Sequence, residues 1–250
     1  MDDQNQMLIY KAWLETRWRF FAGLILLSAM SIYTVLRANG IIHDRELFRN
    51  EHILYAQYIW VILYKGYLQT LWILSAVIIG LGGLWREQAL GVAGFTLSLP
   101  LARRKLVSPR IALGVIEVVA LAFVPSIIIW SLSPITGNSY SLGEAISHAL
   151  LYVSGGLIFY GLGVLLSQIM QGEFSVPATA LGSCLVLYII FQVLRFEDYN
   201  PFDLMSGKHF LDPTTFLLKG QLPWIPMSVL LFLALMMLFI SVKVIERRDF

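Results

Sequence analysis

Residues 85–110 read WREQALGVAGFTLSLPLARRKLVSPR, a basic and amphipathic segment between two apolar stretches. These stretches, residues 67–84 and 111–132, are close to the roughly 20 residues that an α-helix needs to cross a ~30 Å hydrocarbon core. The pattern predicts two transmembrane helices, joined by a segment that lies outside the bilayer. Its basic residues and its apolar face favour docking onto a partner in the cytosol.

The composition of the whole chain is that of a membrane protein. Hydrophobic residues make up 58% of the 250 residues, charged residues 14%, and the mean hydropathy is +0.72, whereas soluble domains contain roughly 25% charged residues. The net charge of +2 is too small to indicate a nucleic-acid partner. Cys184 is the only cysteine, so an intramolecular disulfide is excluded.

The apolar runs predict an all-α integral membrane protein with a single transmembrane domain, residues 1–250, of six spans. The spans are expected at about residues 20–36, 67–84, 111–132, 148–169, 177–194 and 224–244. Apolar and charged residues recur at helical spacing over residues 7–19, which predicts an interfacial amphipathic N-terminal helix. Residues 54–64 are too few to cross and indicate an interfacial or re-entrant segment before the second span.

An even number of spans puts both termini on one side, and the basic residues predict which side. Lys and Arg are enriched in cytosolic segments, and eleven of them share the side of the termini while six lie opposite. The termini are therefore expected in the cytosol. The eleven are Lys11, Arg17, Arg19, Arg86, Arg103, Arg104, Lys105, Arg110, Lys243, Arg247 and Arg248, and the six are Arg37, Arg45, Arg49, Arg195, Lys208 and Lys219.

Three ionisable residues inside or beside the spans are candidate translocation-path residues, because charge in the bilayer costs ~2.5 to 3.5 kcal/mol on insertion scales. Glu117 is the clearest of them. It could pair with Arg110 two turns away or face a cavity between spans. Lys65 can extend toward the interface beside Gly66, and His148 lies at the edge of a span, so a structural role is favoured for both.

Two further regions leave alternatives open. The aromatic and proline residues of the loop 195–223 predict a compact extracytoplasmic cap, or else aromatic anchors at the headgroup level. The glycines of the fourth span permit close helix approach, within the chain or at a subunit or gating interface. These are Gly155, Gly156, Gly161 and Gly163.

The sequence lacks the common catalytic motifs. It has no phosphate-binding G-x-x-x-x-G-K-[ST] loop, no H-E-x-x-H motif and no G-x-S-x-G motif. We therefore predict that the chain is not an enzyme, holds no metal and binds no cofactor of its own. Three other functions stay open as alternatives to the one that the family resemblance below implies. They are an integral-membrane enzyme using Glu117 and His148, a secondary transporter using Glu117, and a membrane scaffold.

In its topology and in the segment 85–110 between the second and third spans, the chain resembles the permease subunits of type-two ABC transporters, mostly exporters. The matching loop residues are Glu87, Gly91, Leu97 or Leu99 with Pro100, the pair Arg103 and Arg104, and Arg110. The C-terminal residues 246–250, ERRDF, are also similar to the tails of that family. The resemblance covers the whole chain in topology but only the loop in motif.

The resemblance implies a coupling helix at about residues 87–99 that inserts into a separate ATP-binding cassette subunit. ATP and Mg²⁺ would then bind to that subunit, and a second permease copy or paralogue would complete the path in the cell membrane of a bacterium or archaeon. Export of an amphipathic molecule, a peptide or a drug is the expected activity. The expected partner-binding residues are Arg86, Glu87, Leu90, Gly91, Phe95, Leu99, Pro100, Arg103 and Arg104.

Overall fold

The computed structural model describes residues 2–49, 52–82, 103–170, 172, 174–194 and 199–247. Within this part of the chain the regular structure is helical, with one isolated antiparallel bridge between Leu211 and Leu218. The α-helices are α1 (Asp2–Arg49), α2 (Tyr55–Ile59), α3 (Leu68–Gly80), α6 (Arg103–Leu132), α7 (Leu142–Ile169), α8 (Ser175–Leu194), α9 (Pro201–Ser206) and α10 (Trp224–Arg247). A π-helix, η1 (Trp60–Tyr67), and the 3₁₀ turns η2 (Ser133–Thr136) and η3 (Lys208–Phe210) complete the set.

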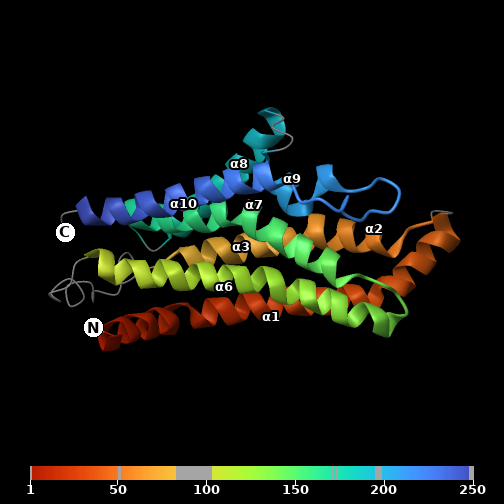
Figure 1. The fold of residues 1–250 in the computed structure, drawn as a ribbon, viewed down its shortest axis with the longest axis horizontal. Coiled ribbons are helices and arrows are strands. Elements are labelled where there is room, and N and C mark those ends of the chain that lie inside the picture. Colours follow the sequence, from red (N-terminus) through yellow and green to blue (C-terminus); the bar gives the residue numbers. More distant parts are fainter. Residues whose placement is uncertain are drawn as a thin grey trace.

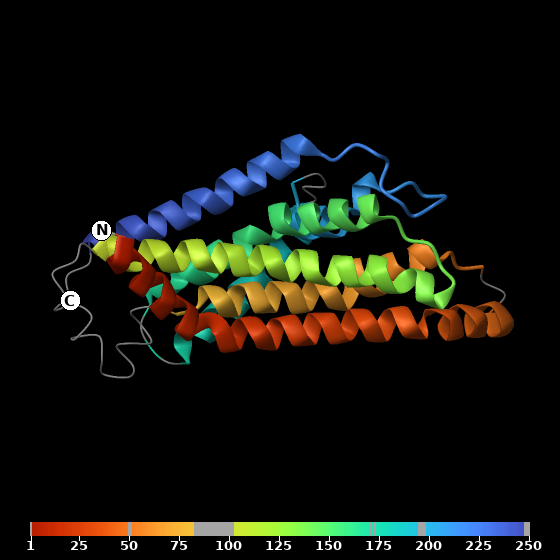
Figure 2. The ribbon, with the colours of Figure 1, turned by 60° about the horizontal axis from the view of Figure 1, so that its bottom comes forward.

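Six helical elements of the described residues are long and apolar enough to cross a membrane, which confirms the predicted all-α class with six membrane-length helices. Most of them run along one another as a bundle, whereas α8 lies obliquely to the others (Figure 1). The beginning of α1, the beginning of α6 and the end of α10 lie together at one end of the bundle in both views (Figures 1 and 2). The end of α3 points the same way, so the first and last helices and both flanks of residues 83–102 share this end, called here the terminal end (Figure 1).

The N-terminal region differs from the expectation of an interfacial helix, residues 7–19, followed by a separate span. The structure has one helix, α1, from Asp2 to Arg49, because the sequence offers no glycine or proline before Gly23. The first part of α1 is angled to the rest (Figure 2). Thr16 Oγ1 lies 3.2 Å from the Ala12 carbonyl oxygen, a backbone contact of the kind that bends helices.

The second membrane-length element also differs from the expectation. Residues 54–64 were expected to form a segment separate from the second span, but α2, η1 and α3 follow one another along one path (Figure 1). The path is broken at Gly66, whose φ of −103° and ψ of −115° are not helical. A side chain does not fit there, since a Cβ atom would lie 2.9 Å from the Val61 carbonyl oxygen. The sequence pair Lys65 and Gly66 therefore marks a break inside one element.

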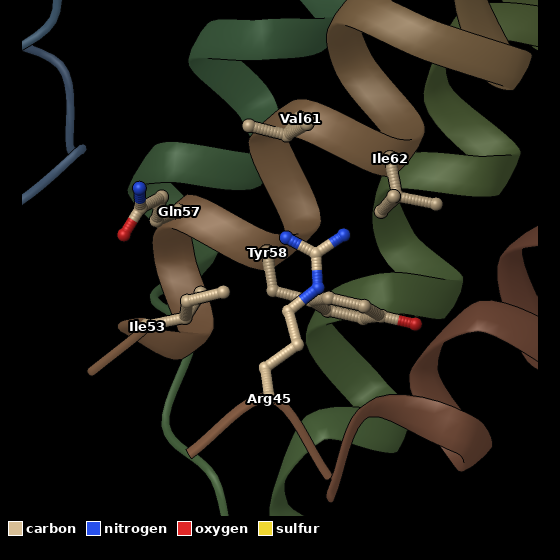
Figure 3. A pocket seen from close by; sticks show the side chains of 6 residues that line it. All are labelled: Arg45, Ile53, Gln57, Tyr58, Val61 and Ile62. Atoms are coloured by element: carbon tan, nitrogen blue, oxygen red, sulfur yellow. The ribbon is translucent and has the colours of Figure 1, made fainter. Parts of the chain in front are cut away.

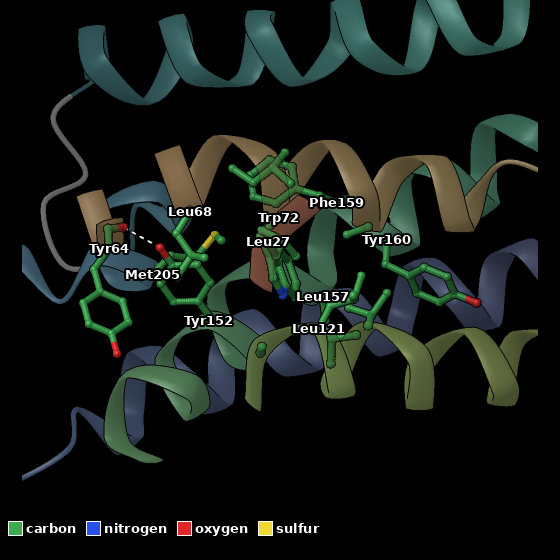
Figure 4. Close-up of a cluster of buried hydrophobic side chains, with 14 of the residues drawn as sticks. Leu27, Tyr64, Leu68, Trp72, Leu121, Tyr152, Leu157, Phe159, Tyr160 and Met205 are labelled. Atoms are coloured by element: carbon green, nitrogen blue, oxygen red, sulfur yellow. Dashed lines mark hydrogen bonds between the residues drawn. The ribbon is translucent and has the colours of Figure 1, made fainter. Parts of the chain in front are cut away.

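The core lies between α1, α3, α6 and α7 and is rich in aromatic side chains (Figure 4). Trp72 of α3 is fully buried and meets the Tyr152 ring of α7 edge-on at 6.0 Å. The Tyr152 hydroxyl donates a 2.5 Å hydrogen bond to the Tyr64 carbonyl oxygen. That oxygen lies in the π-helical turn, whose irregular backbone therefore receives a donor from α7.

The glycines of α7 serve packing within the chain. Gly163 faces the backbone of α3, because a Cβ atom there would lie 2.8 Å from the Val77 carbonyl oxygen and 3.4 Å from the Gly80 Cα. Gly156 likewise accommodates the Trp72 ring. Close approach within the chain is therefore one role of these glycines, as expected for small residues at helix contacts. Their role at a subunit or gating interface stays a prediction.

The connection between α8 and α10 is compact over its described residues 199–223. Its outer part is a hairpin held by Asp212, which accepts hydrogen bonds of 2.5 and 2.8 Å from the Thr214 hydroxyl and backbone N–H. These hydrogen bonds lower the pKa of the Asp212 carboxyl. The inner part, α9, packs well inside the bundle, since a Cβ atom at Gly155 of α7 would lie 2.8 Å from the Pro201 carbonyl oxygen.

Candidate functional site

The terminal end of the bundle holds a polar network between α1 and α6. Thr16 donates a 2.5 Å hydrogen bond to Glu117 Oε1, and Arg110 pairs with Glu15 at 3.3 Å. Glu117 is 2% exposed, and its Oε2 atom accepts no hydrogen bond from the residues that the structure describes. The predicted partner Arg110 thus forms its ion pair with Glu15, the neighbour in sequence of Thr16, which contacts Glu117.

A second contact ties α1 to the end of α3. Arg19 donates to the carbonyl oxygens of Ile78, at 3.1 Å, and of Leu81. The last carbonyls of a helix have no partner within the helix, so an arginine from a neighbouring helix can cap them. The guanidinium of Arg110 lies against Gly82, where it occupies the space that a side chain would need. The two flanks of residues 83–102 are therefore both fixed to the same part of α1.

The predicted partner-binding residues fall mostly beyond these flanks. Arg104 is exposed near the beginning of α6, and Arg103 is the first residue of that helix. The other members of the set lie outside the described residues, and their role stays a prediction. They are Arg86, Glu87, Leu90, Gly91, Phe95, Leu99 and Pro100.

His148 lies near the other end of the bundle, among aromatic side chains. Its ring stacks on Tyr64 with 4.0 Å between the centroids, and its Nδ1 lies 3.0 Å from the Glu144 carbonyl oxygen and 3.4 Å from the Tyr140 hydroxyl. Burial raises the pKa of the Tyr140 hydroxyl well above its ordinary value. None of these contacts of His148 is shared with Glu117, so the structure does not bring these two residues together.

Glu144 joins this cluster to the outer hairpin. Its two carboxylate oxygens accept from the Leu218 backbone N–H at 3.2 and 3.3 Å. The Phe216 ring of the hairpin lies 6.0 Å from the Trp60 ring of η1, in the element Tyr55–Gly80 that is interrupted at Gly66 and is called here the broken helix. The hairpin is thus held against both α7 and η1, and the polar groups of this end serve to fix it.

Lys65, the third candidate, lines a cleft of about 440 Å³ between the broken helix, α8 and α9. Its polar lining was not anticipated from the sequence beyond Lys65 itself. The only signal was the Lys65–Gly66 break in an apolar run, because interrupted membrane helices commonly accompany binding sites. The other lining residues are Gln69, Thr70, Ile73, Cys184, Leu185, Tyr188, Gln192, Phe202, Asp203 and Ser206.

A smaller pocket lies at the end of the bundle opposite the terminal end, where the last turns of α1 meet α2 (Figure 3). The Arg45 side chain extends over Tyr58 there, and apolar side chains such as Ile62 form the walls. Its volume of about 50 Å³ has room for a few water molecules only. It is therefore too small for a substrate of the size that ligand pockets normally take.

The described residues contain no group of three or more His, Cys, Asp and Glu side chains placed to hold a metal ion. Comparison of the chain with protein-family profiles, with curated proteins and with solved structures finds no significant match.

Proposed function

We propose that this chain is a membrane-spanning permease subunit of an ABC transporter. It would form the translocation path with a second permease copy or paralogue and take its energy from a separate ATP-binding cassette subunit. Export of an amphipathic molecule, a peptide or a drug is the activity most in keeping with the apolar spans. The terminal end of the bundle is cytosolic in this proposal, as the distribution of basic residues predicts.

One observation supports the proposal above the others. The two described flanks of residues 83–102 are both fixed to α1, through Arg19 and Arg110. A partner that pushes on the segment would therefore move α1, α3 and α6 together. Rigid-body motion of packed helices is a common means of carrying a conformational change through a protein.

The rival enzymatic function needs polar groups that converge on one substrate. Glu117 is held by Thr16 of α1, whereas His148 is held by Tyr140 and Glu144. The two sets of contacts have no residue in common, which weighs against a shared catalytic site.

Co-purification tests the partner directly. The full chain, expressed with its neighbouring genes and extracted in mild detergent, is expected to bring down an ATP-binding subunit at one copy per permease, as measured by mass spectrometry of the complex. Recovery of the chain as a stable species without such a subunit, from cells that express the neighbours, would reject the proposal.

Substitutions in the predicted coupling helix test how the subunits communicate. Glu87→Ala and Gly91→Val are expected to leave membrane insertion intact but to uncouple ATP hydrolysis from transport, because the helix would no longer fit its cleft. The measurement compares ATPase activity and substrate-stimulated ATPase activity of the reconstituted complex. Gly182→Val, on α8 where nothing lies within 4 Å of the added Cβ, is the matched control. Normal coupling in both coupling-helix variants would contradict the assignment.

A further inference from the structure

The 440 Å³ cleft beside Lys65 lies where two interrupted segments meet. One is the element from Tyr55 to Gly80 with its break at Gly66, and the other is α9, reached after α8 has ended. Non-helical backbone at membrane depth is tolerated where it is buried in protein or lines a cavity. The cleft is therefore the part of the bundle where polar backbone and polar side chains have a structural reason to gather.

Side chains of the broken helix supply donors to the carbonyls of α9. Trp60 Nε1 donates to the Ser206 carbonyl oxygen at 2.7 Å, and Gln69 Nε2 donates to the Phe202 carbonyl oxygen at 2.5 Å. Asn200 caps α9 by accepting from the Phe202 N–H at 3.0 Å. These contacts hold α9 against the broken helix at the floor of the cleft.

Among the charged residues that line the cleft, Lys65 is the one that forms no ion pair with the described residues. The only carboxylate of the lining, Asp203, accepts from Asn200 at 3.2 Å and pairs with Lys208 at 3.5 Å and with His209 at 3.4 Å. Lys65 extends its ammonium over the Trp60 ring, 5.3 Å from the centroid, and forms no ion pair with the described residues. A cation without a counter-ion at the wall of a membrane cleft favours an anionic ligand.

The opposite wall of the cleft is formed by α8 and combines polar and apolar side chains. This helix lies outside the bundle core. Helix α8 buries only Val176 and Ala180 fully. Leu185 and Tyr188 are exposed residues of this wall, and Gln192 adds an amide near its outer end. A ligand in the cleft would therefore contact polar groups at one end and apolar side chains along its length.

We propose that this cleft binds a single-chain or lipid amphiphile with an anionic headgroup, the headgroup at Lys65 and Gln192 and the acyl chain along Ile73, Leu185 and Tyr188. The volume of about 440 Å³ lies within the range of small-molecule sites and accommodates a headgroup with the first part of a chain. The proposal concerns the isolated chain and does not depend on an ATP-binding partner.

Cys184, the only cysteine of the chain, lines the cleft and provides the reporter. The full chain is placed in phosphatidylcholine nanodiscs, and the rate of alkylation by a membrane-permeable maleimide is measured with and without dodecyl phosphate. At a ligand concentration about ten times its dissociation constant the rate is expected to fall about tenfold, because only the unoccupied fraction reacts. Zwitterionic dodecylphosphocholine and inorganic phosphate are expected to leave the rate unchanged.

Variants show whether the protection depends on the lysine. Lys65→Gln is expected to weaken dodecyl phosphate binding about tenfold, through loss of one charged hydrogen bond, and Lys65→Arg is expected to keep it. Lys219→Gln, in the outer connection, is the matched control. If Lys65→Gln does not fold, the comparison of dodecyl phosphate with dodecylphosphocholine on the native chain still tests whether the cleft requires an anionic headgroup.

The outcomes separate the two sources of such a ligand. Protection by phosphatidylglycerol built into the nanodisc would identify a bilayer lipid, whereas protection by dodecyl phosphate alone would identify a monomeric amphiphile, and both support the site. Equal protection by dodecylphosphocholine, no protection by either anionic amphiphile, or unchanged protection in Lys65→Gln would overturn it. Failure of the protection test does not affect the co-purification result for the ATP-binding subunit. Failure of the co-purification test likewise does not affect the ligand proposed for the cleft.

Discussion

Gly163→Val is expected to destabilise the folded chain by about 3 kcal/mol, at the upper end of the range for overpacking a tight core. The new Cβ atom would lie 2.8 Å from the Val77 carbonyl oxygen, a backbone atom that cannot rotate away. Gly80 faces α7 in the same manner, with its own Cβ position 2.7 Å from the Tyr160 carbonyl oxygen. The two backbones are therefore in mutual contact, and relief requires that α3 and α7 move apart.

The measurement is thermal unfolding of the purified chain in detergent. Unfolding is monitored as the loss of monodisperse protein after heating. Gly182→Val supplies the control, because it makes the same change on α8, where nothing lies within 4 Å of the added atom. The control is expected to unfold with the native chain. If the two variants unfold at the same temperature, α3 and α7 do not approach as closely as described.

The sequence predicts those features of the fold that depend on local composition. Runs of about 20 apolar residues predict six membrane-length helices, and the structure confirms them in its described part. The glycines of residues 155–163 predicted close helix contacts, and Gly163 and Gly156 make such contacts with α3. Each of these signals can be read from a single stretch of chain.

The boundaries of the first two elements were harder to predict. Residues 7–19 have the charge pattern of a surface helix, yet no breaker separates them from the following apolar run, so α1 is continuous. Residues 54–64 are too short to cross by themselves, and Gly66 does interrupt the helix. The π-helical turn, which receives a hydrogen bond from Tyr152 of α7, keeps the two parts on one path. This stabilisation comes from another helix and has no local signature.

The polar sites depend still more on packing between distant segments. Glu117 and its donor Thr16 are 101 residues apart in sequence, and nothing in either segment identifies the other as its partner. In the cleft, Lys65 was recognisable as a charge inside an apolar run, but Gln69, Asp203 and Ser206 come together with it only when α9 folds back onto α7. A polar residue near the end of a span does not indicate which distant residues it will contact in the folded chain.

Arg110→Gln is expected to destabilise the chain by about 3 kcal/mol, the lower part of the range for removing one partner of a buried ion pair. The Arg110 side chain is 12% exposed and Glu15 is 29% exposed, so water reaches Glu15 in part and moderates the loss. Glu117, at 2% exposed, has no such access. With the arginine removed, Glu15 would keep Lys11 at 4.0 Å, and Glu117 would keep the charge of Arg19, but both would lose the cation that lies between α1 and α6.

Arg104→Gln makes the same change on an exposed position of α6, and its unfolding temperature is expected to stay near that of the native chain, since isolated surface charges contribute little. The double variant Arg110→Gln/Glu117→Gln is expected to regain part of the lost stability, because it removes a buried carboxylate that has lost one of its two nearby cations, Arg110 and Arg19. Interaction energies of about 0.5–3 kcal/mol are typical of groups in one network. Strict additivity of the two substitutions would mean that Arg110 stabilises Glu15 alone, and that Glu117 depends on Thr16 without help from the arginine.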